Sequence, residues 1–148
     1  QMIPYYATED NLRLQLCRPW MMIGTDAGGR ATEGPFSRGV PHPRNYGTFP
    51  RVLSRYVREQ GVLSLEEAIH KMTGLPADKL RWAGRGLVKP GFKADLVVFD
   101  PQTVADRATY EEPHQYAVGI HHVLVNGTPV LRDGEHLGAR PGAMVGRS

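Results

Sequence analysis

The chain has 148 residues, about the size of one globular domain, and its 41% hydrophobic residues are enough to build a single core. Its net charge is only +3, with the basic residues scattered along the chain, which argues against a surface for nucleic acid. No apolar run approaches the ~18 residues of a membrane span, and the single cysteine, Cys17, cannot form an internal disulfide, so we expect a reducing, cytoplasmic setting without a membrane partner.

The first predicted element is a helix from residue 9 to about residue 18. Thr8 can cap it, because its side-chain oxygen can accept a backbone N–H, and Glu9 and Asp10 favour the positive end of the helix dipole. The apolar side of this helix is assigned to Ile3, Leu12 and Leu16. Pro19 ends it, and the apolar run of residues 20–23 predicts a strand buried on both faces, as in a parallel sheet.

A long loop follows, from Gly24 to Gly47. It is rich in glycine and proline and has little hydrophobic periodicity, and loops of this length inside compact domains are often functional. Helical patterns resume after Thr48, with Pro50 in the first turn and Gly61 at the end. Residues 64–67 form a capping box that opens a helix ending near residue 74, and a short turn runs from residue 76 to residue 80.

After Gly86 the pattern changes to that of strands. Residues 89–92 predict a type II turn, and residues 94–100 predict a β-branched strand. Residues 123–125 and 129–131 flank Asn126-Gly127, which predicts a hairpin with a type I′ turn. Pro129 is expected at a strand start or edge, and residues 133–134 predict a further turn.

Asp26 and Arg44 are the main candidates for chemistry. Asp26 follows the predicted buried strand by three residues, where α/β folds place reactive groups, and a carboxylate there can be a metal ligand, a general base or merely a cap of the turn. Arg44 follows His42 and Pro43 in a stiff segment, so its guanidinium can grip a carboxylate or form an ordinary surface ion pair. His42 is a possible ligand or proton carrier. The histidines are not clustered as a zinc site requires.

Segments spread over nearly the whole chain match the pattern of one known family. They are residues 22–26, 27–35, 42–44, 46–53, 71–73, 94–101, 104–109, 112–116, 123–127 and 133–136. Together they resemble the C-terminal third of N-acyl-D-amino-acid deacylases (D-aminoacylases) of the amidohydrolase superfamily. Residues 94–100 and 125–127 alone would indicate only the superfamily, whereas the Asp26 loop and residues 42–44 narrow the resemblance to the deacylases.

The resemblance implies an α/β fold in which residues 1–85 are the C-terminal part of a metal-dependent (β/α)8 TIM barrel. Residues 86–148 would be the C-terminal part of a small β-sandwich domain, with a tail. It also implies that Asp26 is the catalytic aspartate, which takes a proton from zinc-activated water and delivers it to the leaving amine. Arg44 matches the family arginine that binds the α-carboxylate of an N-acyl-D-amino acid, and His42 and Tyr46 are further candidates for substrate binding.

The zinc ligands of the family have no counterpart here, because its early His-x-His, its bridging cysteine or lysine and its two later histidines are missing. Asp26 is the metal-ligand candidate that the resemblance leaves in this chain. We therefore expect a fragment of a longer deacylase, or a chain that associates with the remainder of one. The isolated chain is expected neither to hold zinc firmly nor to turn over substrate.

Two other functions remain open. One is a different amidohydrolase, such as a hydrolase of cyclic amides. The other is a non-catalytic assembly module, for which self-association through an exposed barrel edge would be expected.

Overall fold

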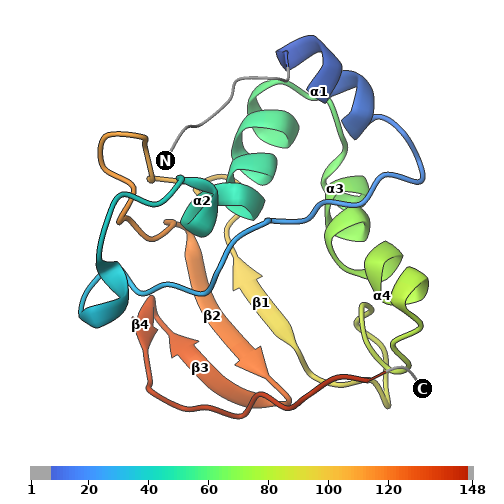
Figure 1. The fold of residues 1–148 in the computed structure, drawn as a ribbon. Coiled ribbons are helices and arrows are strands. Elements are labelled where there is room, and N and C mark those ends of the chain that lie inside the picture. The colour runs from blue at the N-terminus through green and yellow to red at the C-terminus, as the bar shows by residue number, and fades with distance from the viewer. Residues whose placement is uncertain (1–7, 147–148) are drawn as a thin grey trace.

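The computed structural model describes residues 8–146, so Ile3, assigned above to the first helix, lies outside the described residues. The architecture is α/β. A layer of helices lies above and beside a four-stranded antiparallel sheet with strand order β1-β2-β3-β4 (Figure 1). The helices are α1 (Glu9–Leu16), α2 (Arg44–Arg51), a π-helix (Val52–Glu59), α3 (Leu65–Met72) and α4 (Gly74–Leu80); the strands are β1 (Leu96–Phe99), β2 (Ile120–Val125), β3 (Thr128–Arg132) and β4 (Glu135–His136).

Helix α1 forms where its cap predicted it. The Thr8 hydroxyl accepts a hydrogen bond from the Asn11 N–H at 3.2 Å, which satisfies one of the free donors of the first turn. The helix ends at Leu16, earlier than the predicted end near residue 18. Leu16 itself is buried, and Leu12 packs against the same core.

The prediction that residues 20–23 are a strand buried on both faces does not hold within the described residues, where this segment forms no strand. Trp20 is 68% exposed and Met22 41% exposed, while Met21 and Ile23 pack against the core, so the burial alternates. The Ile23 N–H bonds to the Lys71 carbonyl, and no strand of the described region lies beside this segment. A strand needs a neighbour to complete its ladder of hydrogen bonds, and this segment has none within residues 8–146.

The side chain of Lys71 also binds the backbone at this segment and just before it. Its side chain is buried, and its ammonium group donates to the carbonyl oxygens of Arg18 and Met21. These bonds compensate the burial of a charged group, which is costly when it has no partner.

The helix predicted after Thr48 begins earlier in the structure. Helix α2 starts at Arg44, so Pro50 lies inside it and not in its first turn. Proline has no N–H to offer the carbonyl four residues back. Just beyond it the chain continues as a π-helix, whose end bonds the Gln60 N–H to the Arg55 carbonyl. As predicted, Gly61 ends the helix, with φ +60°.

The capping box of α3 is confirmed. The Glu67 N–H donates to the Ser64 hydroxyl at 3.1 Å, and the Ser64 N–H donates to the Glu67 carboxylate at 2.9 Å. The second of these bonds lowers the pKa of Glu67 below its ordinary value. Helix α4 begins at Gly74, two residues before the predicted turn.

The sheet is built from two hairpins whose turns were predicted. Asn126 and Gly127 both have positive φ (+48° and +79°), as a type I′ turn between β2 and β3 requires. Asp133 and Gly134 turn the chain from β3 to β4 in the same way. Pro129 faces Leu124 of β2 but lies beyond the pairing with β4, so its missing N–H costs no ladder bond.

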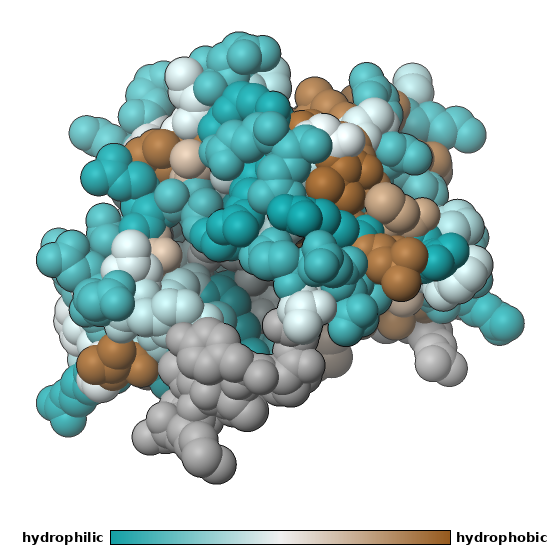
Figure 2. All heavy atoms as spheres, turned by 90° about the horizontal axis from the view of Figure 1, so that it is seen from above, coloured by the Kyte–Doolittle hydropathy of each residue, from teal (hydrophilic) through white to brown (hydrophobic). Residues whose placement is uncertain are grey.

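The core lies between the helices and one end of the sheet. Its buried apolar residues are Leu16, Val52, Leu53, Tyr56, Leu63, Ala68 and Val104, and Phe99 and Ile120 from the sheet pack against them. Seen from above, hydrophobic residues are scattered among hydrophilic ones (Figure 2). No helix within residues 8–146 combines the length and apolar character that crossing a membrane requires.

Candidate active site

The loop that leads into α2 brings Asp26 and Arg44 together. Arg44 is the first residue of α2, and its guanidinium forms an ion pair with the Asp26 carboxylate at 2.7 Å. Asp26 has a φ of +47°, which is uncommon for a residue other than glycine and is frequently found at functional sites. The two residues that the sequence singled out for chemistry are therefore direct neighbours.

This ion pair is open to solvent. The Asp26 side chain is 85% exposed and that of Arg44 is 41% exposed. Water screens such a pair, which typically contributes about 0–1 kcal/mol. A substrate carboxylate can therefore compete for the fork of Arg44 at a small energetic cost, and Asp26 is accessible to water.

His42 supports the start of α2. Its Nδ1 accepts a hydrogen bond from the Arg44 N–H at 3.0 Å, so the remaining ring proton is on Nε2, which lies 3.2 Å from the Tyr110 hydroxyl. The two rings also meet edge to face, with centroids 5.1 Å apart. Burial, and secondly the Arg44 charge, lower the pKa of His42. The geometry assigns His42 to positioning the backbone beside Arg44.

Tyr46 points its hydroxyl at the loop. The hydroxyl donates to the Ala31 carbonyl at 3.1 Å and lies 3.0 Å from His114 Nδ1. Burial, and secondly Tyr116, raise the pKa of Tyr46, while Arg30 acts in the opposite sense. The phenol therefore remains protonated at neutral pH and is able to donate.

His114 continues this chain of contacts to the far side of the loop. Its Nε2 lies 2.9 Å from the Gly39 carbonyl, which can only accept. His114 therefore links the Tyr46 hydroxyl on one side to the Gly39 backbone on the other.

Two further contacts hold the loop. The Tyr116 hydroxyl accepts from the Thr32 N–H at 3.2 Å, and the Asn45 side chain accepts from the Gly28 N–H at 3.2 Å. The Asn45 amide also donates to the His42 carbonyl. The loop is thus attached to α2 on one side and to residues 110–116 on the other.

Sequence reasoning assigned no role to Tyr110, His114 and Tyr116. The available signal was the segment 112–116, which belongs to the family pattern without any obvious chemistry. Only the fold shows that its side chains reach the loop that carries Asp26.

The metal-ligating residues of the described region do not form a site. No group of three or more histidine, cysteine, aspartate or glutamate residues within residues 8–146 could hold a metal ion. The arrangement offers one solvent-accessible carboxylate, one guanidinium, and a loop held in place by hydrogen bonds.

Comparison with known proteins places this site in a family. The model of the amidohydrolase family matches residues 23–131, more than half of the chain, and the chain belongs to this family. Within it, the chain is 53% identical over 108 residues to a D-aminoacylase of Alcaligenes xylosoxydans xylosoxydans, covering 73% of this chain and 22% of that protein. It is 56% identical over 106 residues to the N-acyl-D-aspartate deacylase of the same organism, covering 71% and 21%. The resemblance to the deacylases is confirmed.

Solved structures agree with the sequence relatives. A crystal structure of D-aminoacylase superposes with a TM-score of 0.85 at 47% identity, covering 95% of this chain and 28% of that one. The N-acyl-D-glutamate deacylase of Bordetella bronchiseptica, complexed with zinc and a phosphonate inhibitor, superposes with a TM-score of 0.75 at 45% identity, covering 89% and 28%. The chain therefore spans about a fifth to a quarter of the length of the curated relatives it matches.

Proposed function

We propose that the chain is part of a zinc-dependent N-acyl-D-amino-acid deacylase, to which it contributes an acid–base residue and a carboxylate-binding residue. The observation that carries the proposal is the direct contact of Asp26 with Arg44 in a loop held by Tyr46 and His114, within the segment that matches the family. The substrates named for the relatives, N-acyl-D-aspartate and N-acyl-D-glutamate, all carry an α-carboxylate.

In this proposal residues 1–85 supply the closing part of a (β/α)8 barrel, with residues 20–24 as its last strand. Residues 86–148 supply strands of a β-sandwich. The exposed Trp20 and Met22 would then face neighbouring barrel segments, which explains why an apolar run lies at the surface of this chain. A matching strand beside residues 20–23 would complete the ladder that this segment lacks within the described region.

The residues that the structure describes do not fit a zinc site, since no group of three donors that could hold a metal ion occurs within residues 8–146. Zinc in the proposed enzyme would supply Lewis-acid chemistry, held by ligands elsewhere in the longer chain. We assign to this chain only proton transfer and substrate orientation.

Asp26 is proposed to take a proton from the attacking water and to deliver it to the leaving amine. Asp26 lies 2.7 Å from the guanidinium that is proposed to hold the substrate, so its carboxylate is within reach of a substrate bound there. Arg44 is proposed to bind the substrate α-carboxylate through two parallel hydrogen bonds. Binding of the substrate would draw Arg44 away from Asp26 and leave that carboxylate as the free base.

Substrate profiling of the full-length enzyme that contains this segment tests the proposal. We expect hydrolysis of N-acetyl-D-amino acids, measured by release of the free amine, with little activity on the L-enantiomers. Faster hydrolysis of cyclic amides would favour the other amidohydrolase reaction. A full-length protein without either activity would favour an assembly role.

A further inference from the structure

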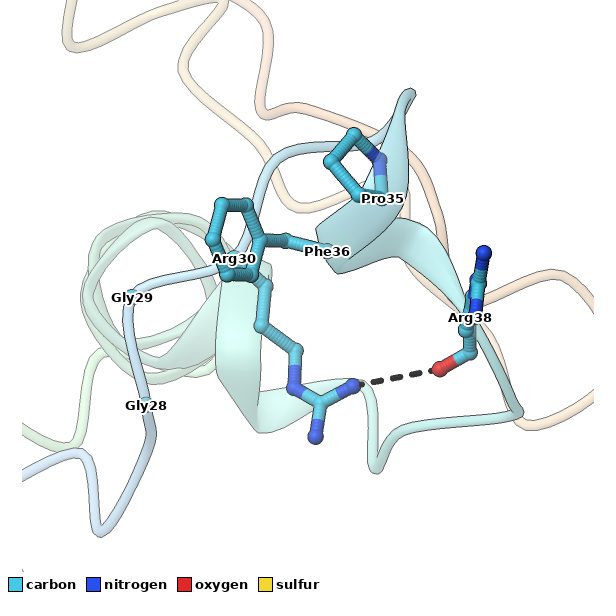
Figure 3. A pocket seen from close by; sticks show the side chains of 6 residues that line it. All are labelled: Gly28, Gly29, Arg30, Pro35, Phe36 and Arg38. Atoms are coloured by element: carbon cyan, nitrogen blue, oxygen red, sulfur yellow. Dashed lines mark hydrogen bonds between the residues drawn. The ribbon is translucent and has the colours of Figure 1, made fainter.

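A pocket opens in the loop directly after Asp26. It has a volume of about 490 Å³ and is lined by Gly28, Gly29, Arg30, Pro35, Phe36 and Arg38 (Figure 3). Gly28 bonds to Asn45, the residue that follows Arg44, so the pocket adjoins the Asp26–Arg44 pair. Neither the family match nor the proposed reaction assigns a role to these side chains.

The walls of this pocket are held from outside. On one side Gly28 bonds to Asn45 and Ala31 to Tyr46; on the other, Gly39 bonds to His114. Gly28 and Ala31 lie toward one end of the stretch that lines the pocket, and Gly39 directly follows its other end. Backbone contacts at both ends restrict the loop, which lowers the conformational entropy lost when a ligand enters.

The pocket is cationic. Among its described lining residues are two arginines and no acid. Figure 3 shows the Arg30 guanidinium directed across the pocket toward the backbone of Arg38, whose carbonyl accepts a hydrogen bond from Arg30 at 3.3 Å. A guanidinium has five N–H donors, and this bond uses one of them. Arg30 is therefore oriented by the loop and keeps donors for a carboxylate.

Phe36 adds an apolar surface to the same pocket. Its side chain is exposed although the residue is large and apolar, and it lines the pocket together with Arg30 (Figure 3). A ligand with methylene groups and a terminal carboxylate would meet both surfaces. An uncharged acyl chain would gain contact with Phe36 but would have to desolvate Arg30 without compensation.

We infer that this pocket is a subsite for a second carboxylate of the substrate, the side-chain carboxylate of an acidic N-acyl-D-amino acid, and that Arg30 binds it. The inference rests on the proposed function, in which Arg44 takes the α-carboxylate. Arg30 would thus determine side-chain specificity, with Arg38 contributing its carbonyl to orient Arg30 and its charge at the rim.

The test uses the full-length enzyme and a matched pair of substrates, N-acetyl-D-glutamate and N-acetyl-D-glutamine, which have nearly the same shape and differ in side-chain charge. The quantity measured is the ratio of their kcat/KM values. Arg30→Gln is expected to lower the ratio of acidic to neutral substrate about tenfold, as loss of one charge-assisted hydrogen bond implies. The ratio for Arg30→Lys is expected to lie between those of the wild type and Arg30→Gln, because lysine keeps the charge but loses the planar fork.

Arg140→Gln is the matched control, because it removes the same charge from the exposed C-terminal segment and should leave the ratio unchanged. An unchanged ratio in Arg30→Gln, or a wild-type preference for the glutamine derivative, would overturn the subsite while the deacylase function stands. A wild-type enzyme that hydrolyses neither substrate would overturn the proposed function and the subsite with it.

Discussion

The two hairpins of the sheet and the loop of residues 24–43 are both rich in turn-forming residues, yet they are held in different ways. In the hairpins, the turn residues adopt positive φ and the adjoining strands pair with each other, so neighbours in sequence define the conformation. The loop contains one short 3-10 turn, and its backbone is held by side chains such as Tyr116, which is 84 residues away from its partner Thr32. The residues proposed for chemistry therefore lie in the region whose shape depends on distant contacts.

The largest expected effect tests whether the loop, and not the sheet, carries the chemistry. Asp26→Asn in the full-length enzyme should lower kcat by roughly two orders of magnitude or more, because an amide cannot take up the proton. Asp78→Asn, on the exposed face of α4, is the control and should leave kcat unchanged. A silent Asp26→Asn would reduce Asp26 to the structural partner of Arg44.

The next prediction concerns Gly119, which directly precedes strand β2 of the sheet. A Cβ at Gly119 would lie 2.4 Å from the backbone nitrogen of Val104, which is buried and cannot move aside, and φ there is +76°. Gly119→Ala should therefore lower the free energy of unfolding by roughly 2–4 kcal/mol, measured by denaturant titration. Gly134→Ala has a similar φ of +82° but open space around it, so about 1 kcal/mol is expected. Equal losses would show that steric contact with Val104 is unimportant.

The third prediction tests whether Arg44 binds the α-carboxylate of the substrate. Arg44→Gln should lower kcat/KM for an N-acetyl-D-amino acid about tenfold or more, because the α-carboxylate loses a charge-assisted partner. The same variant should change kcat/KM much less for the corresponding carboxamide, which has no α-carboxylate. Equal losses on the acid and the carboxamide would contradict the role given to Arg44. Arg44→Lys should not restore the wild-type value, since an ammonium lacks the fork.

A smaller effect tests the long-range anchors directly. His114→Phe removes the contacts to Tyr46 and to the Gly39 carbonyl, so the loop should open more often. Tryptic cleavage after Arg30 and Arg38 should accelerate severalfold in the native protein. His136→Phe, in β4, is the control, because the His136 ring accepts a hydrogen bond from the N–H of Gly138, two residues further along the chain. An unchanged cleavage rate in His114→Phe would show that the loop holds its own conformation.

The smallest effect is a pH dependence at His42. Burial and the Arg44 charge lower the pKa of His42 below its ordinary value of 6.5. A group with a lowered folded-state pKa stabilises the fold above its unfolded pKa, and this contribution is lost as the pH falls through the folded value. The hydrogen bond by which His42 supports the start of α2 should therefore weaken in acid. NMR titration of the His42 ring measures the pKa. Arg44→Gln should raise this pKa and Arg140→Gln should not; a wild-type pKa at or above 6.5 would contradict the assignment.

The elements that were predicted well are those with short-range causes. The Thr8 cap, the capping box at Ser64 and the Asn126-Gly127 turn each depend on groups within three residues of one another. The failures have long-range causes. Residues 20–23 have the composition of a strand but pair with no strand in the described region, and α2 begins before Pro50, at Arg44, directly after the segment in which His42 contacts Tyr110.

The candidate site was predicted in part. Asp26 and Arg44 were singled out from their positions, and the structure places them 2.7 Å apart, but their roles in catalysis remain predictions. Tyr110, His114 and Tyr116 were not assigned roles, because an isolated histidine or tyrosine in an irregular segment carries no spacing that identifies its partner. The folded structure identifies their partners.

The sequence by itself determined the local elements, the family pattern and the identities of the two charged residues proposed for chemistry. Caps, turns and hydrophobic periodicity act over a few residues, so their free energies are decided by neighbours in the chain. Only the tertiary structure shows that residues 110–116 hold the loop and that Arg30 lines a pocket in the same loop as Asp26. These contacts depend on where segments tens of residues apart meet, and that is set by packing against the common core.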